Sequence, residues 1–221
     1  MTDEPVPWWR AALAEGAAVF LFVGGALSLG AALDSPQPAF PFLVGGLYMA
    51  AVYAVAHISG AQLNPALTLA LWVIQRLTFG RMAAYLGAQL LGTGAAWLLL
   101  RLATPEGDGS RLLFPREGTS PGGILLLAAF FTFFLTFVYG ATLLDRRAAP
   151  GIFGIALGAV VAGAAFLGLP LHPGEALVLE LWAKDFSLAW AFSLGPLLGA
   201  LLGGLLYEGI WHRQGESHPL P

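Results

Sequence analysis

Two short polar stretches with residues suited to binding chemistry interrupt this otherwise apolar chain. The first is Asn64-Pro65-Ala66, within the segment HISGAQLNPALTLALW at residues 57–72. A proline suits the first turn of a helix, and an asparagine before it can cap that turn while its amide donates hydrogen bonds. These donors and the positive end of the helix would replace the hydration of a small neutral solute and repel cations. The alternative is that Asn64 serves only as a helix cap.

The second polar stretch is His172-Pro173-Gly174-Glu175, within LPLHPGEALVLELW at residues 169–182. His172 stands at the capping position before a proline, as Asn64 does. His172 and Glu175 are three residues apart and could share a helical face as metal ligands. Pro173 and Gly174 lie between them, however, and the sequence offers no other cluster of ligands, so we expect no metal here.

Several other chemistries are excluded by what the chain lacks. It has no cysteine, which rules out disulfides, thiol catalysis and cysteine-ligated metals. It has no nucleophile elbow and no histidine pair at metal spacing. The net charge of −3 gives no indication of nucleic-acid binding. We therefore expect neither an enzyme, nor a cofactor, nor a nucleic-acid partner.

The composition predicts an integral membrane protein. Of the 221 residues, 57% are hydrophobic and 10% charged, and the mean hydropathy is +0.75, whereas soluble domains carry about 25% charged residues. A hydrocarbon core about 30 Å thick needs roughly 20 apolar residues per helix. Two apolar stretches, 65–74 and 173–182, are too short to cross and predict re-entrant half-helices. Six longer stretches predict spans in the lipid bilayer, at 9–33, 40–57, 82–102, 122–144, 151–169 and 188–210.

The order of these segments predicts an internal inverted repeat. Three spans with a half-helix after the second occur twice, in residues 1–110 and 111–221, and an odd number of spans inverts the second half. Asn64 precedes Gln89 by 25 residues, and His172 precedes Pro196 by 24. Glu15 precedes Asn64 by 49 residues, whereas Ala128 precedes His172 by only 44. We interpret the five missing residues as a shortened loop before His172.

Basic residues predict the orientation in the membrane. If the N-terminus is cytoplasmic, six of the ten Lys and Arg residues fall inside and four outside. This modest excess places both termini in the cytoplasm and the protein in the inner (plasma) membrane. The inside set is Arg10, Arg76, Arg81, Arg146, Arg147 and Arg213, and the outside set is Arg101, Arg111, Arg116 and Lys184.

On these residues the chain resembles the aquaporin and aquaglyceroporin family, the major intrinsic proteins. The motifs that carry the resemblance are SGAQLNPALTLA, AAYLGAQLLGTGAA, TFFLTFVYGATLLD, GPLLGALLGGLLYE and the early Glu15, which together cover nearly the whole chain. The resemblance implies an all-α fold of six transmembrane helices and two re-entrant half-helices. It further implies a passive channel for water or small neutral solutes, and a homotetramer with one pore per subunit.

The resemblance also implies roles for individual residues. The equivalent of Glu15 braces the re-entrant loops from behind the pore, and we expect His57 to hydrogen-bond the loop backbone rather than line the pore. The family's selectivity filter combines an Arg after the second Asn-Pro-Ala box with two facing residues. By register these positions are Glu175, Val44 and Ala165 here.

The chain departs from the family's pattern in its second half. His172-Pro173-Gly174-Glu175 stands where the family has Asn-Pro-Ala-Arg, and Ala128 stands opposite Glu15. We expect a wider, Arg-less filter that admits glycerol-like polyols, urea or neutral hydroxides, with His172 supplying an N–H donor. Protonation of His172 beside Glu175 would make the pore pH-sensitive. The alternatives are that Glu175 points outward at the helix start and that His172 only caps.

Two other functions stay open at this point. One is a gated or cation-permeable channel, in which Glu175 and Glu180 draw cations inward. The other is a scaffold that kept the fold but does not conduct.

Overall fold

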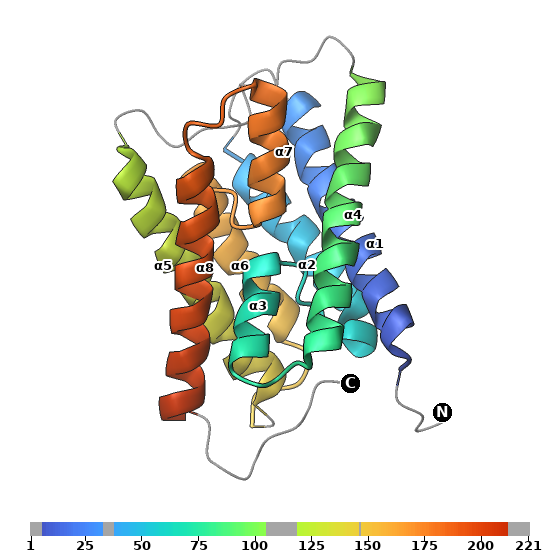
Figure 1. The fold of residues 1–221 in the computed structure, drawn as a ribbon, viewed down its shortest axis with the longest axis vertical. Helices are drawn as coiled ribbons and strands as arrows, with labels where there is room; N and C mark the ends of the chain where they lie inside the picture. Colours follow the sequence, from blue (N-terminus) through green and yellow to red (C-terminus); the bar gives the residue numbers. More distant parts are fainter. Residues whose placement is uncertain (1–5, 33–37, 105–118, 146, 212–221) are drawn as a thin grey trace.

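In the computed structural model, which describes residues 6–32, 38–104, 119–145 and 147–211, all regular secondary structure of these residues is helical. The α-helices are α1 (Trp8–Ala32), α2 (Phe40–Ser59), α3 (Pro65–Val73), α4 (Phe79–Ala103), α5 (Pro121–Tyr139), α6 (Phe153–Phe166), α7 (Pro173–Ala183) and α8 (Ala189–Leu206). Helices α5 and α8 each end in a π-helical turn, η2 (Gly140–Leu144) and η3 (Tyr207–Trp211). This arrangement confirms the predicted all-α fold with two short helices, α3 and α7 (Figure 1).

Some features used for the predictions lie outside the described residues. They are the chain ends, the boundary at residue 110 between the two predicted halves, and four basic residues, Arg111, Arg116, Arg146 and Arg213. The predicted orientation of the chain in the membrane therefore stays a prediction.

Five of the described helices, α1, α2, α4, α5 and α8, are long and apolar enough to cross a membrane. The sixth predicted span, 151–169, forms only the 14-residue helix α6. At a rise of 1.5 Å per residue α6 is about 21 Å long, which is shorter than a hydrocarbon core of about 30 Å.

The short α6 overturns our interpretation that the loop before His172 is shortened. Helix α2 has 20 residues and is followed by five non-helical residues, 60–64, whereas α6 has 14 and is followed by six, 167–172. Six fewer helical residues and one more connecting residue account for the five-residue difference. The missing residues are therefore helical residues, and the second loop is not shortened.

Local chemistry explains why α6 ends where it does. Gly168 has φ +68°, and its N–H bonds the Ala165 carbonyl at 3.0 Å while the N–H of Leu169 bonds Ala164 at 3.1 Å. These two bonds and the left-handed glycine form a Schellman motif, which closes a helix. Pro170 follows directly and cannot continue the helix, because it lacks an N–H.

The long helices pack in corresponding pairs. Helix α1 lies along α4, and α5 along α8, while α2 and α6 pack against each other. A side chain at Gly92 would collide with the Gly16 carbonyl, and one at Gly199 with the Ala129 carbonyl. In the first half, Gly16 directly follows Glu15, and Gly92 lies three residues after Gln89. In the second half, Ala129 directly follows Ala128, and Gly199 lies three residues after Pro196. The two crossings thus have the register that the sequence spacing predicted.

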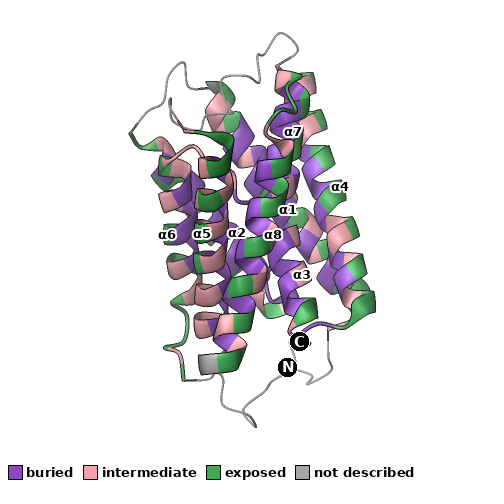
Figure 2. Ribbon diagram, turned by 60° about the vertical axis from the view of Figure 1, so that its left-hand side comes forward, coloured by how far each residue is buried: buried purple, intermediate pink, exposed green. Residues whose placement is uncertain are grey.

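The half-helices approach each other from opposite ends of the molecule. In Figure 1, α3 lies in the lower half and α7 in the upper half, and both pack against α4 and α8. Buried residues line the helix faces that meet inside the bundle, and exposed residues cover the outer faces (Figure 2). Large exposed apolar residues such as Leu91, Leu102, Leu126 and Leu202 lie on the outer surface, as lipid contact requires.

The close approach of α5 and α8 predicts the effect of adding one methyl group. We expect G199A to lower the free energy of unfolding by about 1–3 kcal/mol, because the new Cβ overlaps the Ala129 backbone. Gly87 of α4 has open space at its Cβ position, so G87A is the matched control and should leave stability equal or slightly higher. Thermal unfolding in detergent measures both variants. Equal midpoints for the two would contradict the tight crossing.

Candidate pore site

Asn64 joins the two short helices at the centre of the molecule. Its Oδ1 accepts hydrogen bonds from the backbone N–H groups of Ala66 at 2.8 Å and Leu67 at 3.4 Å, which caps α3. Its Nδ2 donates to the carbonyl of Leu171, in the segment just before α7, at 2.9 Å. The N-terminal ends of α3 and α7 therefore meet, and one amide proton of Asn64 is used to hold them together while the other is left for a further acceptor.

Glu15 anchors the first connecting segment from behind. It is completely buried, and all four of its partners are donors: the Ser59 hydroxyl, the N–H groups of Gln62 and Leu63, and the Gln89 amide, at 2.7 to 2.9 Å. The same Gln89 amide donates to the Thr68 hydroxyl of α3 at 3.0 Å. The position of α3 thus depends on a carboxylate in α1 and an amide in α4.

Three tyrosine hydroxyls satisfy carbonyl groups of the same segment. Tyr139 of α5 donates to Gly60 at 2.7 Å, Tyr85 of α4 to Ser59 at 3.0 Å, and Tyr48 of α2 to Gln62 at 3.3 Å. The segment needs these partners because Gly60, Ala61 and Leu63 have positive φ, so a regular hydrogen-bond ladder cannot form. We did not predict these tyrosines, and only their place in apolar spans, where a hydroxyl needs a partner, could have indicated them.

His57 does not brace the loop, contrary to our prediction. Its side chain is exposed and makes no hydrogen bond to any described residue. The reason is its place on α2: Ser59, two residues further along, faces the interior and takes the contact with Glu15.

An ion pair fixes the far end of α3. Arg76, just after α3, is 8% exposed, and its guanidinium contacts both carboxylate oxygens of Glu208 in η3 at 2.7 to 3.0 Å. This bidentate geometry is among the stronger forms of ion pair. It ties the C-terminal end of the half-helix to the end of α8.

The second half lacks the whole polar brace. At the positions equivalent to Glu15 and Gln89 stand Ala128 and Pro196, and both are buried. Pro170 is the equivalent of Gln62 and has no N–H, so one of the two backbone donors that a carboxylate would satisfy is gone. The segment before α7 relies instead on the Schellman end of α6 and on the bond from Asn64.

His172 caps α7 as Asn64 caps α3, but within the described part of the chain it does not donate a hydrogen bond to the other half as Asn64 does. Its Nδ1 accepts the backbone N–H of Glu175 at 3.0 Å, which assigns the proton of a neutral ring to Nε2. Nε2 is enclosed and has no hydrogen-bond partner among the described residues. The ring packs beside Gly174 and Thr93 of α4, since a Cβ on Gly174 would lie 2.9 Å from His172 Cε1 and 3.1 Å from Thr93 Oγ1.

Glu175 lies in the first turn of α7 and is 8% exposed. Its carboxyl group makes no hydrogen bond or ion pair with the described residues, and its oxygens are not among the enclosed atoms that lack a partner. The carboxyl group therefore borders space that water can enter. The alternative prediction was that Glu175 points outward. Residues on the outward face of α7, such as Leu177 and Leu181, are about half exposed, whereas Glu175 is buried, so it does not lie on that face.

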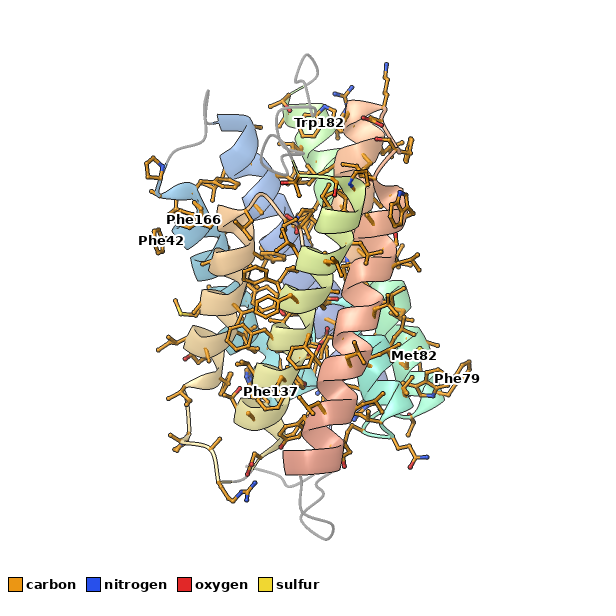
Figure 3. All side chains as sticks on the ribbon, turned by 90° about the vertical axis from the view of Figure 1, so that its left-hand side faces the viewer. Phe42, Phe79, Met82, Phe137, Phe166 and Trp182 are labelled. Atoms are coloured by element: carbon orange, nitrogen blue, oxygen red, sulfur yellow. The ribbon has the colours of Figure 1, made fainter. Side chains whose placement is uncertain are left out.

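The remaining predicted residues are less closely tied to this centre. Val44 is buried in the second turn of α2, and Ala165 is half-buried in the last turn of α6. Phe42 and Phe166 meet edge to face near these two residues, with ring centroids 5.8 Å apart (Figure 3). Helix α7 packs chiefly on α8 and α4, so the convergence of Val44 and Ala165 with Glu175 remains a prediction. No three potential metal-binding side chains gather within the part of the chain that the structure describes.

Comparisons with known proteins agree with this architecture. The model of the major intrinsic protein family matches residues 4–207. Aquaporin TIP4-1 of Zea mays is 34% identical over 96% of this chain and 89% of its own length, and Aquaporin TIP4-4 of the same plant is 38% identical over 77% and 70%. The solved aquaglyceroporin from Plasmodium falciparum superposes with a TM-score of 0.76 at 18% identity, covering 92% of this chain and 97% of its own.

The buried Glu15 predicts a large effect of removing its acceptors. We expect E15L to lower the free energy of unfolding by about 3–5 kcal/mol, because four buried donors lose their partner. E15Q keeps one acceptor oxygen but turns an amide N–H toward donors, so its loss should be intermediate. A128E is the reciprocal variant, and it should not stabilise the second half, since Pro170 offers no N–H. Unfolding midpoints in detergent measure all three, and an E15L midpoint equal to that of the unmodified protein would refute the bracing role.

Proposed function

Because the chain belongs to the major intrinsic protein family, we propose that it forms a passive transmembrane channel for water and small neutral solutes. The observation that carries this proposal is the hydrogen bond from Asn64 Nδ2 to the Leu171 carbonyl, 2.9 Å long, which brings together the starts of two oppositely directed half-helices. Non-helical backbone at this depth is tolerated only where it is buried in protein or lines a water-filled cavity. Two positive helix ends at one level oppose cations and offer donors to polar solutes.

We assign the selectivity of the channel to an Arg-less filter at Val44, Ala165 and Glu175. Neither Val44 nor Ala165 offers a hydrogen-bond group, and their small side chains leave a wide neck. Such a neck suits glycerol-like polyols, urea and neutral hydroxides as well as water. The pore centre is formed by Asn64-Pro65-Ala66 at the start of α3 and by His172-Pro173-Gly174 at the start of α7.

The proposal includes how the protein is placed and assembled. The two halves, 1–110 and 111–221, form one membrane domain with inverted topology, in the inner (plasma) membrane and with both termini cytoplasmic. The functional unit is a homotetramer with one pore per subunit, and the protein is not an enzyme. Glycines on several helices allow the close packing that such bundles need.

A second candidate is a cation-permeable channel, which the unpartnered carboxyl group of Glu175 favours. An ionisable group inside a membrane usually marks an ion pathway or has a partner. Glu180 gives this candidate less support, because the residue is only 2% exposed and its Oε1 is enclosed. Glu180 lies five residues after Glu175 in α7, so the two side chains point in directions about 140° apart around the helix axis.

Osmotic swelling of proteoliposomes tests the proposed channel. We expect stopped-flow light scattering to show faster water and glycerol equilibration than in empty vesicles, with no ionic conductance in planar bilayers. Rates equal to those of empty vesicles would instead indicate a non-conducting scaffold. A conductance that follows the cation gradient would favour the second candidate.

Exchanging the cap of α7 tests the role assigned to His172. H172N keeps an acceptor for the Glu175 N–H and an N–H donor, so water flux and stability should stay within about twofold and about 0.5 kcal/mol of the unmodified protein. H172L removes the cap, and we expect it to cost about 1 kcal/mol and to slow water flux. Equal behaviour of the two variants would show that the cap has no role.

Placing an arginine in the filter tests its proposed width. We expect E175R to narrow the neck, so that glycerol flux falls more than water flux in the same vesicles. Unchanged relative rates would argue against Glu175 lying at the filter.

A further inference from the structure

We propose that Gly174 is a positioning residue of the pore centre. By leaving its Cβ position empty, it makes room for the His172 ring, so that this ring caps α7 and fixes where the first turn of α7 lies. This inference deepens the proposed channel function and rests on it for its flux measurements. It depends on the close contact of Gly174 with His172 and Thr93, on the fixed orientation of the ring, and on the packing of the first half-helix.

The backbone of Gly174 does not require a glycine. Among the described residues, those with positive φ do not include Gly174, which lies in the first turn of α7. Alanine is favoured over glycine in a helix. What a glycine contributes at this position is therefore the absence of a side chain.

A methyl group on residue 174 would have no space. Its carbon would lie 2.9 Å from His172 Cε1, 3.2 Å from His172 Nδ1 and 3.1 Å from Thr93 Oγ1. Non-bonded carbon atoms pack best at about 3.5–4.0 Å and repel each other at clearly shorter distances. Two side chains, one from the cap of α7 and one from α4, thus close the same position.

Neither neighbour can move aside without losing a hydrogen bond. The His172 ring is buried, and its Nδ1 accepts the Glu175 N–H at 3.0 Å. Thr93 is buried as well, and its hydroxyl donates to the Gln89 carbonyl at 2.9 Å. An added methyl group must therefore turn the ring, which breaks the cap, or push the start of α7 away from α4.

The first half-helix is packed by a different set of residues. Asn64 caps α3, Ala66 lies two residues later, and Ala200 of α8 lies four residues after Pro196. Ala66 and Ala200 belong, with Ala70, to one cluster of buried apolar residues. A carboxamide cap is thus compatible with a methyl group two residues after it.

The equivalent positions of the second half have larger neighbours and a smaller residue between them. His172 is the cap, Gly174 lies two residues later, and Thr93 of α4 lies four residues after Gln89. An imidazole replaces the carboxamide, and a threonine stands at the position of Ala200. Both contact the place that a Cβ of residue 174 would fill. The histidine cap and the glycine therefore form one unit, in which the ring depends on the missing methyl group.

A double-mutant cycle tests this dependence. In the unmodified protein, G174A should lower the water permeability of proteoliposomes at least about threefold and the unfolding midpoint in detergent by about 3–10 °C, because the methyl group overlaps the ring. In the H172N variant, G174A should stay within about twofold and about 2 °C of H172N alone, because the ring is gone. Since the first turn of α7 also carries Glu175, G174A alone should change the ratio of glycerol to water permeability, and H172N/G174A should restore it.

Three further variants separate this coupling from general effects. Gly94 of α4 is exposed and has open space at its Cβ position, so G94A should change neither flux nor midpoint. G199A overlaps the Ala129 backbone, so it should lower the midpoint equally with and without H172N. T93A removes one neighbour but leaves the ring, so T93A/G174A should recover only part of the loss.

The inference and the channel proposal fail in different ways. A loss from G174A that is equal with and without H172N would overturn the inference, and so would no loss in either. Full recovery by T93A with none by H172N would also overturn it, because Thr93 would then be the limiting contact. A G174A protein that does not fold, beside a folded H172N/G174A protein, supports the inference. If no vesicle equilibrates faster than empty ones, the channel proposal fails, and the midpoints still decide the role of Gly174.

Discussion

The first re-entrant segment depends on one buried carboxylate. Glu15 accepts the N–H groups of Gln62 and Leu63, the Ser59 hydroxyl and the Gln89 amide, while three tyrosine hydroxyls satisfy the carbonyls of the same short segment. Without these partners the segment would place unpaired polar groups inside apolar surroundings, at a cost of several kcal/mol. With them, Asn64 is held where it can cap α3 and reach Leu171. The left-handed Ala61 and Leu63 are tolerated because the surrounding contacts determine their conformation.

The second segment meets the same physical requirement in another way. It needs fewer external partners, because Pro170 carries no N–H and because the Schellman end of α6 uses the N–H groups of Gly168 and Leu169. Its cap, His172, satisfies the Glu175 N–H within α7. The second half thus lacks a counterpart to Glu15, and its connecting segment also has fewer free backbone N–H groups that a carboxylate could accept. The two halves share a packing register but differ in how their re-entrant backbone is paired.

The fold could be predicted from sequence because its signals are strong and local. Apolar length identified the spans, and Pro65 and Pro173 marked the starts of α3 and α7 at their true positions. The spacing of Glu15, Asn64 and Gln89 against their counterparts predicted a register between the two halves, and the crossings of α1 with α4 and of α5 with α8 share that register. The interpretation of the five-residue shortfall was wrong because spacing alone does not say which element loses residues. The signal was nevertheless present in Gly168 and Pro170, which end α6 early.

Side-chain directions could not be read from the pattern. His57 and Ser59 are two residues apart, and only the rotation of α2 decides which one faces Glu15. The three tyrosines come from α2, α4 and α5, and their convergence on one segment is a tertiary property. The enclosed Nε2 of His172 and the open oxygens of Glu175 likewise depend on packing around α7. The convergence of Val44 and Ala165 on a filter stays a prediction.

The short length of α6 also affects the lipid around the protein. Helices α2 and α6 run in opposite directions, since Phe166 meets Phe42 and Phe153 meets Tyr53, so the last six residues of α2 extend about 9 Å beyond the start of α6. Ile155 and Phe166 on this helix are more than half exposed, so acyl chains contact a hydrophobic wall that is lower than on the neighbouring sides. Such a hydrophobic mismatch thins the bilayer locally, at a fraction of a kcal/mol for each ångström. One flank of the molecule therefore favours shorter-chain lipids, and membrane thickness becomes a factor in where this protein accumulates.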